Sequence, residues 1–246
     1  MTSKLKREYQ VRSAECDRFN QMRIRSLFNL FQDVADLHAE SLGVGYTFCL
    51  ENNLTWMGSG YHVEINRLPK RDEKIELYTW PSDAMPLMAV REFELKTNTG
   101  EVLVKATSGW ILIDLNKRRP LPLQKYIAHL KVIKERSVNN IDGLKKVVLP
   151  DDLDLCTFQI VREDDIDINQ HVNNSVYPSW ILDTVSEDFL SSHTLNEVTV
   201  QFKQGVQKEN KVAIFTKIED NNTYSLITDA DKTSEFVKIV ALWQKK

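Results

Sequence analysis

The chain has 246 residues, 42% of them hydrophobic, which is enough for one large domain or two of about 100–130 residues. Its net charge of −3 at pH 7 provides no basic field, which argues against nucleic acid as a partner. Because the sequence has no run of about 18 apolar residues, we expect no membrane span.

The first half of the chain predicts a short strand, one amphipathic helix and four further strands. One helix face is expected to carry, at a period of about 3.6 residues, Leu27, Leu30, Phe31, Val34 and Leu37, and Leu42-Gly43 is typical of a helix end. Strands are expected at residues 9–12, 54–65, 74–80, 88–97 and 101–114, the last two joined by a turn at 98–100.

The second half predicts the same order of elements. A strand at 155–161 and a loop at 162–169 precede a mostly helical segment at 172–189, in which Pro178 either kinks the helix or lies near its start. Further strands are expected at 197–202, 212–218, 224–230 and 236–243.

The two halves also align residue by residue. Asn20-Gln21 aligns with Asn169-Gln170, residues 61–75 align with 198–212 without a gap, and Trp110 aligns with Trp243. This indicates a duplicated unit of about 135–150 residues, with chance likeness between two α+β patterns as the alternative. An apolar helix face needs a sheet to cover it, so each half is expected to curl an antiparallel sheet around its helix.

Residues 116–150 fit neither half. They contain Pro120, Pro122 and Pro150, many basic side chains and a short apolar helix pattern at 126–133. We therefore expect an N-terminal domain at 1–115, a linker at 116–150 and a C-terminal domain at 151–246.

Polar side chains concentrate in residues 163–174. Ile166 and Ile168 alternate there with Asp167, Asn169 and His171, which predicts an extended loop with the three polar groups on one side. A carboxylate, an amide and an imidazole within five residues suit acid–base chemistry. The alternative is an ordinary helix cap with a satisfied histidine.

The run Asn-Gln-His-Val-Asn-Asn at 169–174, followed by Tyr177 and Trp180, resembles the signature of the acyl-acyl-carrier-protein (acyl-ACP) thioesterases of plants and bacteria. The strand at 54–65 with Leu68-Pro69 is similar to the family's first half. The resemblance covers nearly the whole chain. It implies an α+β tandem double hotdog fold, in which each half is a long helix wrapped by a curved antiparallel sheet.

The resemblance implies a thioester hydrolase that releases free fatty acid from fatty-acyl-ACP and so ends chain elongation. The family's catalytic residues map onto Asp167, Asn169 and His171. His171 would act as general base or position a water, Asn169 would donate to the carbonyl oxygen, and Asp167 would orient the site.

The chain departs from the family at one place. Where the family often has Glu, followed in plants by Cys, the matching positions are Gly205 and Val206. Three explanations are open. Water attacks the thioester directly, a nearby acid such as Glu209 replaces the family's Glu, or the alignment with the family is shifted at this place.

The first half holds Asp17, Asn20 and Met22 at the places of the catalytic groups, with Met22 in place of the histidine. We therefore expect it to house the acyl chain instead. The candidate substrate-binding residues are Met22, Phe28, Phe31, Trp56 and Met57, together with Asn173. Ordinary core packing is the alternative for each of them.

The expected partner is acyl carrier protein with its acyl-phosphopantetheine, attracted by basic residues such as those at 117–119. We expect no nucleic acid or membrane partner, no cofactor and no metal, and a monomer or a homodimer. Three distant cysteines and a charged start without an apolar run favour a cytoplasmic protein without a signal peptide. The alternatives are a hotdog thioesterase acting on coenzyme A esters and a non-catalytic acyl-binding protein.

Overall fold

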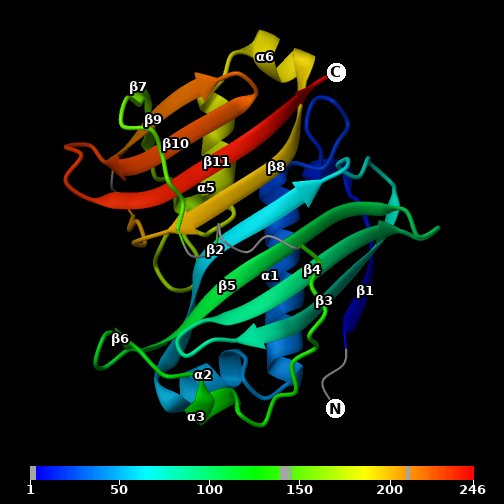
Figure 1. The fold of residues 1–246 in the computed structure, drawn as a ribbon, viewed down its shortest axis with the longest axis vertical. Helices are drawn as coiled ribbons and strands as arrows, with labels where there is room; N and C mark the ends of the chain where they lie inside the picture. The colour runs from blue at the N-terminus through cyan, green and yellow to red at the C-terminus, as the bar shows by residue number, and fades with distance from the viewer. Residues whose placement is uncertain (1–3, 139–143, 145, 209–210) are drawn as a thin grey trace. The chain divides into compact units, whose positions relative to one another are not determined.

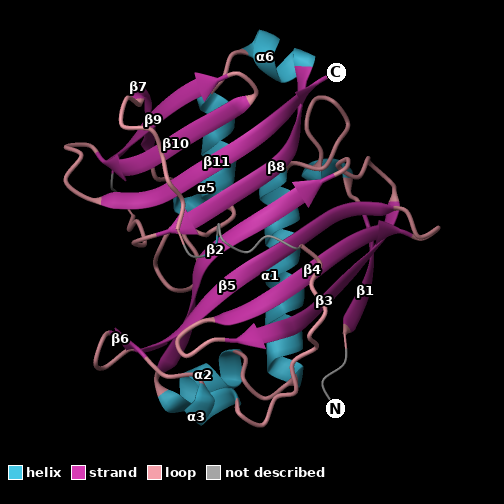
Figure 2. Ribbon diagram, in the orientation of Figure 1, coloured by secondary structure: helices cyan, strands magenta, loops and turns pink. Residues whose placement is uncertain are grey.

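The computed structural model describes residues 4–138, 144, 146–208 and 211–246. The chain divides into two compact units, with the boundary between residues 141 and 142. Each unit contains an antiparallel sheet with helices on one of its faces (Figures 1 and 2).

In the first unit, five strands pair in the order β1-β3-β4-β5-β2. They are β1 (Leu5–Gln10), β2 (Leu54–Ile65), β3 (Lys74–Ala84), β4 (Ala89–Thr97) and β5 (Val102–Asp114), and all pairs are antiparallel. The two-residue β6 (Arg119–Pro120) pairs with the end of β5. The expected turn between β4 and β5 is confirmed, and Gly100 adopts a φ of 92° there.

Helix α1 (Ile24–Ser41) lies against this sheet and buries Leu27, Phe31 and Val34 of the predicted apolar face. The prediction is wrong for Leu37, which is 46% exposed, and Leu30 is half-buried. The ring of Phe31 stacks on Phe93 of β4 with 4.7 Å between the ring centroids. The helix ends at Ser41, Leu42 caps it, and Gly43 follows with a φ of 73°, a left-handed conformation that favours glycine. A short helix that the sequence pattern does not predict, α2 (Tyr46–Asn52), leads into β2.

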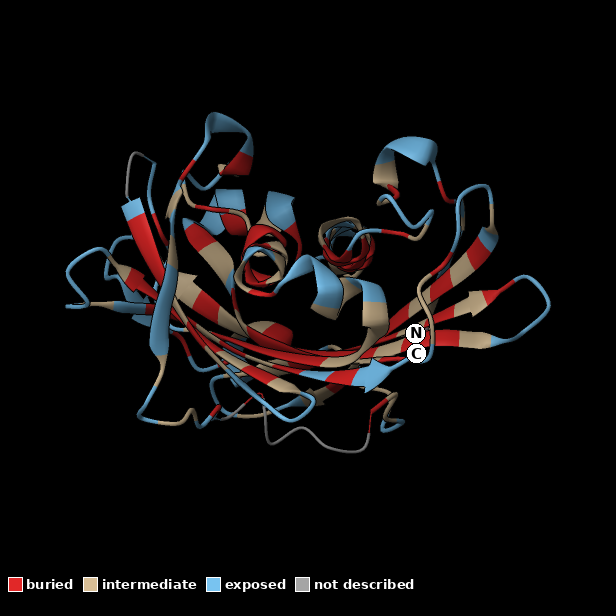
Figure 3. Ribbon diagram, turned by 90° about the horizontal axis from the view of Figure 1, so that it is seen from above, coloured by how far each residue is buried: buried red, intermediate tan, exposed pale blue. Residues whose placement is uncertain are grey.

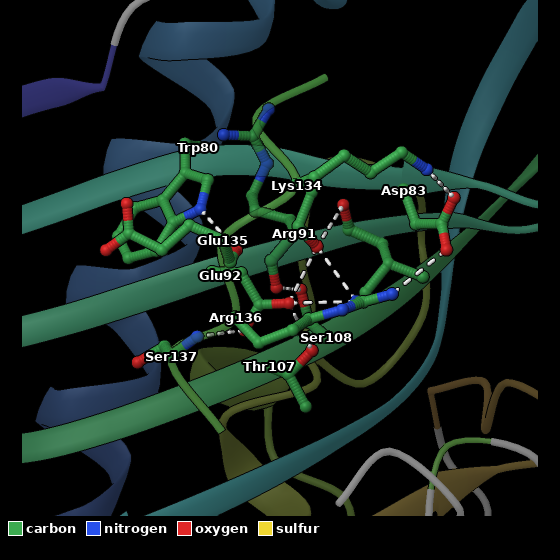
Figure 4. A network of polar contacts seen from close by, with 12 residues as sticks. Trp80, Asp83, Arg91, Glu92, Thr107, Ser108, Lys134, Glu135, Arg136 and Ser137 are labelled. Atoms are coloured by element: carbon green, nitrogen blue, oxygen red, sulfur yellow. Dashed lines mark hydrogen bonds and ion pairs between the residues drawn. The ribbon is translucent and has the colours of Figure 1, made fainter. Parts of the chain in front are cut away.

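On the face of the sheet opposite α1, residues 133–137 pack on β3 and β4 (Figure 4). Neighbouring strand residues point to opposite faces, so Glu92 points away from α1 while Phe93 points toward it. The buried Glu92 carboxylate accepts from Arg136 Nη1 at 3.0 Å and from the Ser137 backbone N–H at 3.1 Å. Trp80 Nε1 donates to the Glu135 carbonyl at 2.9 Å. We name residues 133–137 the strap.

The segment expected to form the linker therefore contains parts that pack on the first unit. Helix α3 (Gln124–Ile127) is shorter than the pattern at 126–133 predicts, and Ile127 packs in a core cluster with Leu121 and Leu123. The division into 1–115, 116–150 and 151–246 stays a prediction.

In the second unit, five strands pair in the order β8-β11-β10-β9-β7. They are β7 (Asp154–Ile160), β8 (His193–Phe202), β9 (Lys211–Glu219), β10 (Asn222–Asp229) and β11 (Glu235–Lys245), again all antiparallel. Starting from β2, the first sheet contains the second, fifth, fourth, third and first strand of its unit. Starting from β8, the second sheet has the same order. The helices lie on one side of the strands in each unit, as the view from above shows (Figure 3).

The prediction of a long helix in each half is wrong for the second unit. Instead of one helix over 172–189, the chain forms α5 (Val176–Trp180), a 3₁₀ turn (Ile181–Thr184) and α6 (Glu187–Ser192). Pro178 lies in the first turn of α5, where its missing N–H costs little. Val185 is extended, and the Ser186 hydroxyl accepts from the Phe189 N–H at 3.1 Å, which starts a new helix.

Candidate functional site

Asp167, Asn169 and His171 lie in one tight turn that precedes α5. The Asp167 N–H donates to the His171 carbonyl at 2.8 Å, and the Gln170 N–H donates to the Asp167 carbonyl at 3.0 Å. Gln170 has a φ of 62°, which closes the turn in a left-handed conformation. The Asp167 carboxylate accepts from the Asn169 backbone N–H at 2.8 Å, as aspartate often does at the start of a turn.

The exposure of the turn differs in one respect from the alternation that the sequence predicts. Ile168 is 77% exposed and does not anchor the turn, because it stands at the tip. Ile166 is half-buried and pairs with the buried Val172, so the base of the turn is anchored on these two residues. Asn169 is exposed, and Asp167 and His171 are half-buried.

The three polar residues do not cap the following helix. Helix α5 begins at Val176, and the cap interaction nearest to it is made by Asn173, whose Oδ1 accepts from the Ser175 N–H at 2.9 Å. Asn173, a predicted substrate-binding residue, therefore shapes the backbone between the turn and the helix.

The imidazole of His171 lies directly on Gly205. A Cβ atom added to Gly205 would be 2.7 Å from His171 Cδ2 and 3.1 Å from Cγ. The backbones also meet, since the Val172 N–H donates to the Val206 carbonyl at 2.8 Å and His171 forms an isolated bridge with Gln207. Glu209, the acid considered as a substitute, lies outside the described residues.

Tyr177 is part of this site, although the sequence assigns its hydroxyl no role. Its hydroxyl accepts from the Val206 N–H at 3.2 Å, and its side chain is almost fully buried. Burial raises the pKa of Tyr177, and the nearby Asp167 carboxylate raises it further. The phenol therefore stays neutral near pH 7 and keeps a proton to donate.

The first unit contains the same turn at Asp17–Gln21. The Asp17 N–H donates to the Gln21 carbonyl at 2.8 Å, the Asp17 carboxylate accepts from the Phe19 N–H at 2.8 Å, and Asn20 has a φ of 63°. The prediction that Met22 stands in place of the histidine is wrong by one residue.

Gln21 occupies the place of His171, and Phe19 that of Asn169. Met22 occupies the place of Val172, and like Val172 it is buried and pairs with the residue before the turn. The predicted alignment of Asn20 with Asn169 is also wrong by one residue. Asn20 matches Gln170, because both have a left-handed φ.

The other predicted substrate-binding residues lie in the first unit with different exposures. Phe31 is fully buried, Trp56 is half-buried with its indole N–H donating to the Val44 carbonyl at 2.8 Å, and Met57 is 42% exposed. Whether they contact an acyl chain stays a prediction.

Comparisons with known proteins match both units to one family. The model of the acyl-ACP thioesterase N-terminal domain matches residues 2–130, and that of the acyl-ACP thioesterase C-terminal domain matches residues 154–245. The chain belongs to the acyl-ACP thioesterase family. The resemblance predicted from residues 169–174 is thereby confirmed.

Individual members of the acyl-ACP thioesterase family agree with this assignment. The chain is 25% identical to oleoyl-acyl carrier protein thioesterase 1 of Arabidopsis thaliana, over 96% of this chain and 71% of that protein. It is 29% identical to a palmitoyl-acyl carrier protein thioesterase of Gossypium hirsutum, over 89% of this chain and 56% of that protein. The chain thus spans between about half and three quarters of the length of these relatives.

Solved structures of acyl-ACP thioesterases share the fold over nearly the whole chain. The 12:0-ACP thioesterase of Umbellularia californica superposes with a TM-score of 0.86 at 25% identity, covering 99% of this chain and 98% of that one. An acyl-ACP thioesterase of Bacteroides thetaiotaomicron gives a TM-score of 0.89 at 19% identity, with 98% of each chain covered.

Two negative findings apply to the described part of this acyl-ACP thioesterase family member. Within residues 4–138, 144, 146–208 and 211–246, no helix is long and apolar enough to cross a bilayer. Within the same described residues, no group of three or more His, Cys, Asp or Glu side chains could hold a metal ion.

Proposed function

We propose that this protein hydrolyses fatty-acyl-ACP thioesters and releases the free fatty acid. One observation carries the proposal: in a chain that both acyl-ACP thioesterase models match, a single turn brings together Asp167, Asn169 and His171. These supply a carboxylate, an amide and an imidazole, which are the groups that thioester hydrolysis by water needs.

His171 is the general base in the proposed mechanism. Among the described residues, its ring makes no side-chain hydrogen bond, so its nitrogens are free to meet water and substrate. The base takes a proton from water, the water oxygen bonds to the carbonyl carbon, and the C–S bond then breaks. The departing thiolate of phosphopantetheine takes the proton back from the imidazolium.

Asn169 and Asp167 have different tasks. The exposed Asn169 amide donates to the carbonyl oxygen as negative charge develops on it. Asp167 shapes the turn, because its carboxylate accepts the Asn169 backbone N–H. Asp17 makes the matching bond in the first unit without a histidine beside it, which supports a backbone task for this aspartate.

We further infer that each unit is one hotdog domain and that the two arose by duplication. The equal strand orders and the matching turns support this inference. The first unit, with Gln21 at the place of the histidine, is proposed to take part in acyl binding rather than in cleavage.

The activity is tested by mixing the purified protein with acyl-ACP and acyl-coenzyme A thioesters of the same chain lengths and measuring the free thiol that appears. Faster release from acyl-ACP supports the proposal. Faster release from acyl-coenzyme A would identify the alternative hydrolase, and binding without thiol release would identify an acyl-binding protein.

The roles of two residues follow from the same assay. His171→Ala should lower kcat by about 10²–10⁴ because it removes the base, and Asn169→Ala should lower kcat by about 10²–10³ because it removes the oxyanion donor. Gln21→Ala and Phe19→Ala are the matched controls in the turn of the first unit. Near-normal kcat in His171→Ala would remove this residue from the mechanism.

A further inference from the structure

We propose that strand β7 is an interface between two copies of this chain, in which it pairs in antiparallel orientation with β7 of a second copy. Among the strands that the structure describes, β7 pairs only with β9, so its other edge is open. The inference goes beyond the proposed function and does not depend on it, because it concerns assembly and not hydrolysis.

The open edge carries exposed apolar side chains. Leu155, Phe158 and Ile160 are 49%, 42% and 73% exposed, and they are three of the seven residues of β7. A single exposed apolar residue is ordinary, but an apolar edge strand also presents unpaired backbone N–H and C=O groups beside its side chains. Such a strand is suited to pair with a strand of another chain.

The three apolar side chains lie on one face of the sheet. Phe158 and Ile160 are two residues apart and so share a face. Leu155 joins them, because the register shift after it leaves it opposite Phe215, two residues from the β9 residue that Phe158 faces. Gln159 points to the opposite face, where its side chain donates to the turn between α5 and α6 at 2.8 Å. The apolar side chains therefore form one strip along the open edge.

The first unit provides an internal comparison, since β1 is the edge strand at the same place in its sheet. The alignment that matches the two turns places Glu8 at the position of Phe158 and Gln10 at that of Ile160. All the exposed residues of β1 are charged or polar, which is the usual protection of an edge strand against pairing. Strand β7 lacks this protection, which favours an occupant for its edge.

The two ends of β7 have opposite charge, which favours a second copy as that occupant. Asp154 begins the strand and Arg162 follows its end, and neither has an ion-pair partner among the residues that the structure describes. Next to Arg162, the Glu163 carboxylate is already paired with Lys208 at 2.7 Å. A two-fold axis near Phe158 brings Asp154 of each copy beside Arg162 of the other, so the edge is complementary to itself.

Pairing of β7 with β1 of another copy is a poorer arrangement. It would leave an open β1 at one end and an open β7 at the other, so that copies would add without limit into a filament. It would also place the charged side chains of β1 against Phe158 and Ile160. Pairing of β7 with β7 closes after two copies.

The test measures the mass of the protein by sedimentation equilibrium over a wide range of concentration. Wild type should approach twice the chain mass of 28.5 kDa as concentration rises. Phe158→Glu with Ile160→Gln, which gives β7 the side chains that β1 has at the same places, should stay at the single-chain mass. Leu37→Glu with Leu50→Gln is the matched control: it changes two exposed apolar residues of the first unit and should dimerise as wild type does.

A charge exchange guards against a variant that folds poorly. Asp154→Arg should weaken the dimer by about 10-fold, because it brings two cations together twice across the axis. Adding Arg162→Asp should restore the dimer, since opposite charges meet again, and a misfolded protein would not recover in this way. A double variant that dimerises no better than Asp154→Arg would overturn the antiparallel pairing.

Cys156 provides an independent readout. It lies on β7 and is exposed in the single chain. Its alkylation should therefore slow in proportion to the dimer fraction as the concentration of wild-type protein rises. In Phe158→Glu with Ile160→Gln the rate of alkylation should be the same at every concentration.

Two results would overturn the proposal directly: wild-type protein that keeps the single-chain mass at every concentration, or a double variant of β7 that dimerises like wild type. If monomeric wild type binds acyl-ACP and the double variant of β7 does not, the edge belongs to the carrier and not to a second copy. None of these measurements requires hydrolysis, so failure of the proposed function and failure of the dimer are seen separately.

Discussion

One aspartate in each unit shows that the candidate site is built on a backbone turn that both units contain. Asp17 and Asp167 both accept the N–H two residues on, although Gln21 follows in one unit and His171 in the other. The turn is therefore a shared scaffold, and its chemistry depends on the side chains that it carries. Only in the second unit are these an amide and an imidazole.

The proposed mechanism uses no thiol, and the cysteines allow this to be checked. Cys16 and Cys49 are buried, and burial raises the pKa of Cys49 to about 11, while Cys156 is exposed. An alkylating reagent at pH 8 should modify Cys156 first and leave the hydrolysis rate within about twofold of its starting value, because the thiolate is the reactive form. Mass spectrometry locates the label, and Cys156→Ser serves as control. Loss of activity that parallels labelling in both proteins would point to a thiol in the reaction.

Acid sensitivity is expected at the loop that joins β2 to β3. The Arg67 guanidinium donates to both Glu73 oxygens, at 2.7 and 3.0 Å, and lowers the pKa of Glu73 below its ordinary value of 4.5. A carboxyl with a lowered folded pKa stabilises the fold above the unfolded pKa, and this contribution is lost as pH falls through the folded pKa.

Glu73→Gln should therefore lower the urea midpoint at pH 7 and lower it progressively less as pH falls below about 4.5. Unfolding followed by circular dichroism from pH 7 to pH 3 measures this. In an Arg67→Met background, the effect of Glu73→Gln on the urea midpoint should depend much less on pH. A difference that is the same at every pH would contradict the expectation.

At the residue scale, the sequence could reveal what lies close along the chain. Asp167, Asn169 and His171 are visible because they fall within five residues and carry a family motif. The contact with Gly205 was not predictable, because it joins distant segments. The Met22 assignment failed because one shared asparagine set the alignment, whereas the φ angles match Asn20 to Gln170.

At the scale of elements, strand patterns predicted more than helix patterns did. The predicted strands overlap the observed ones because period-two alternation and the turn at Gly100 are local signals. The segment 172–189 has a helical composition, but Pro178, Val185 and Ser186 divide it. Pro178 lies at the start of one helix, Val185 is extended and interrupts the helical path, and Ser186 caps the start of the next helix. Together they prevent the apolar residues around them from forming one continuous helix.

The strap makes a prediction of its own about stability. Arg136→Met removes the cation beside the buried Glu92 and should lower the free energy of unfolding by about 2–4 kcal/mol. Lys134→Met is the matched control, because Lys134 pairs with Asp83 from a side chain that is 74% exposed, and it should cost less than about 1 kcal/mol.

Adding Glu92→Gln to Arg136→Met should recover part of the loss, since the remaining buried charge is then removed. Urea unfolding at pH 7 measures all three variants. An Arg136→Met protein as stable as Lys134→Met would show that the strap depends on its backbone hydrogen bonds and not on the ion pair.

At the scale of the whole molecule, the net charge of −3 would repel an acidic carrier unless a basic surface attracts it. Lys117, Arg118 and Arg119 are exposed around the turn between β5 and β6. Replacing all three with Glu should raise KM for acyl-ACP by about 3–10-fold at low salt, with a smaller effect at high salt where screening is strong.

The matched control replaces three other exposed cations, Arg7, Lys70 and Lys232, with Glu. Acyl-pantetheine, which carries no protein, should be hydrolysed equally by both triple variants. An unchanged KM for acyl-ACP in the variant at 117–119 would place the carrier surface elsewhere.

The turn that occurs in both units gives the first unit a template on which a second reaction centre could be designed. Its backbone already has the required bends and hydrogen bonds, so a designer would not need to build a loop. Phe19→Asn and Gln21→His would install the missing amide and imidazole. Two substitutions on an existing backbone turn are few enough for laboratory selection to explore.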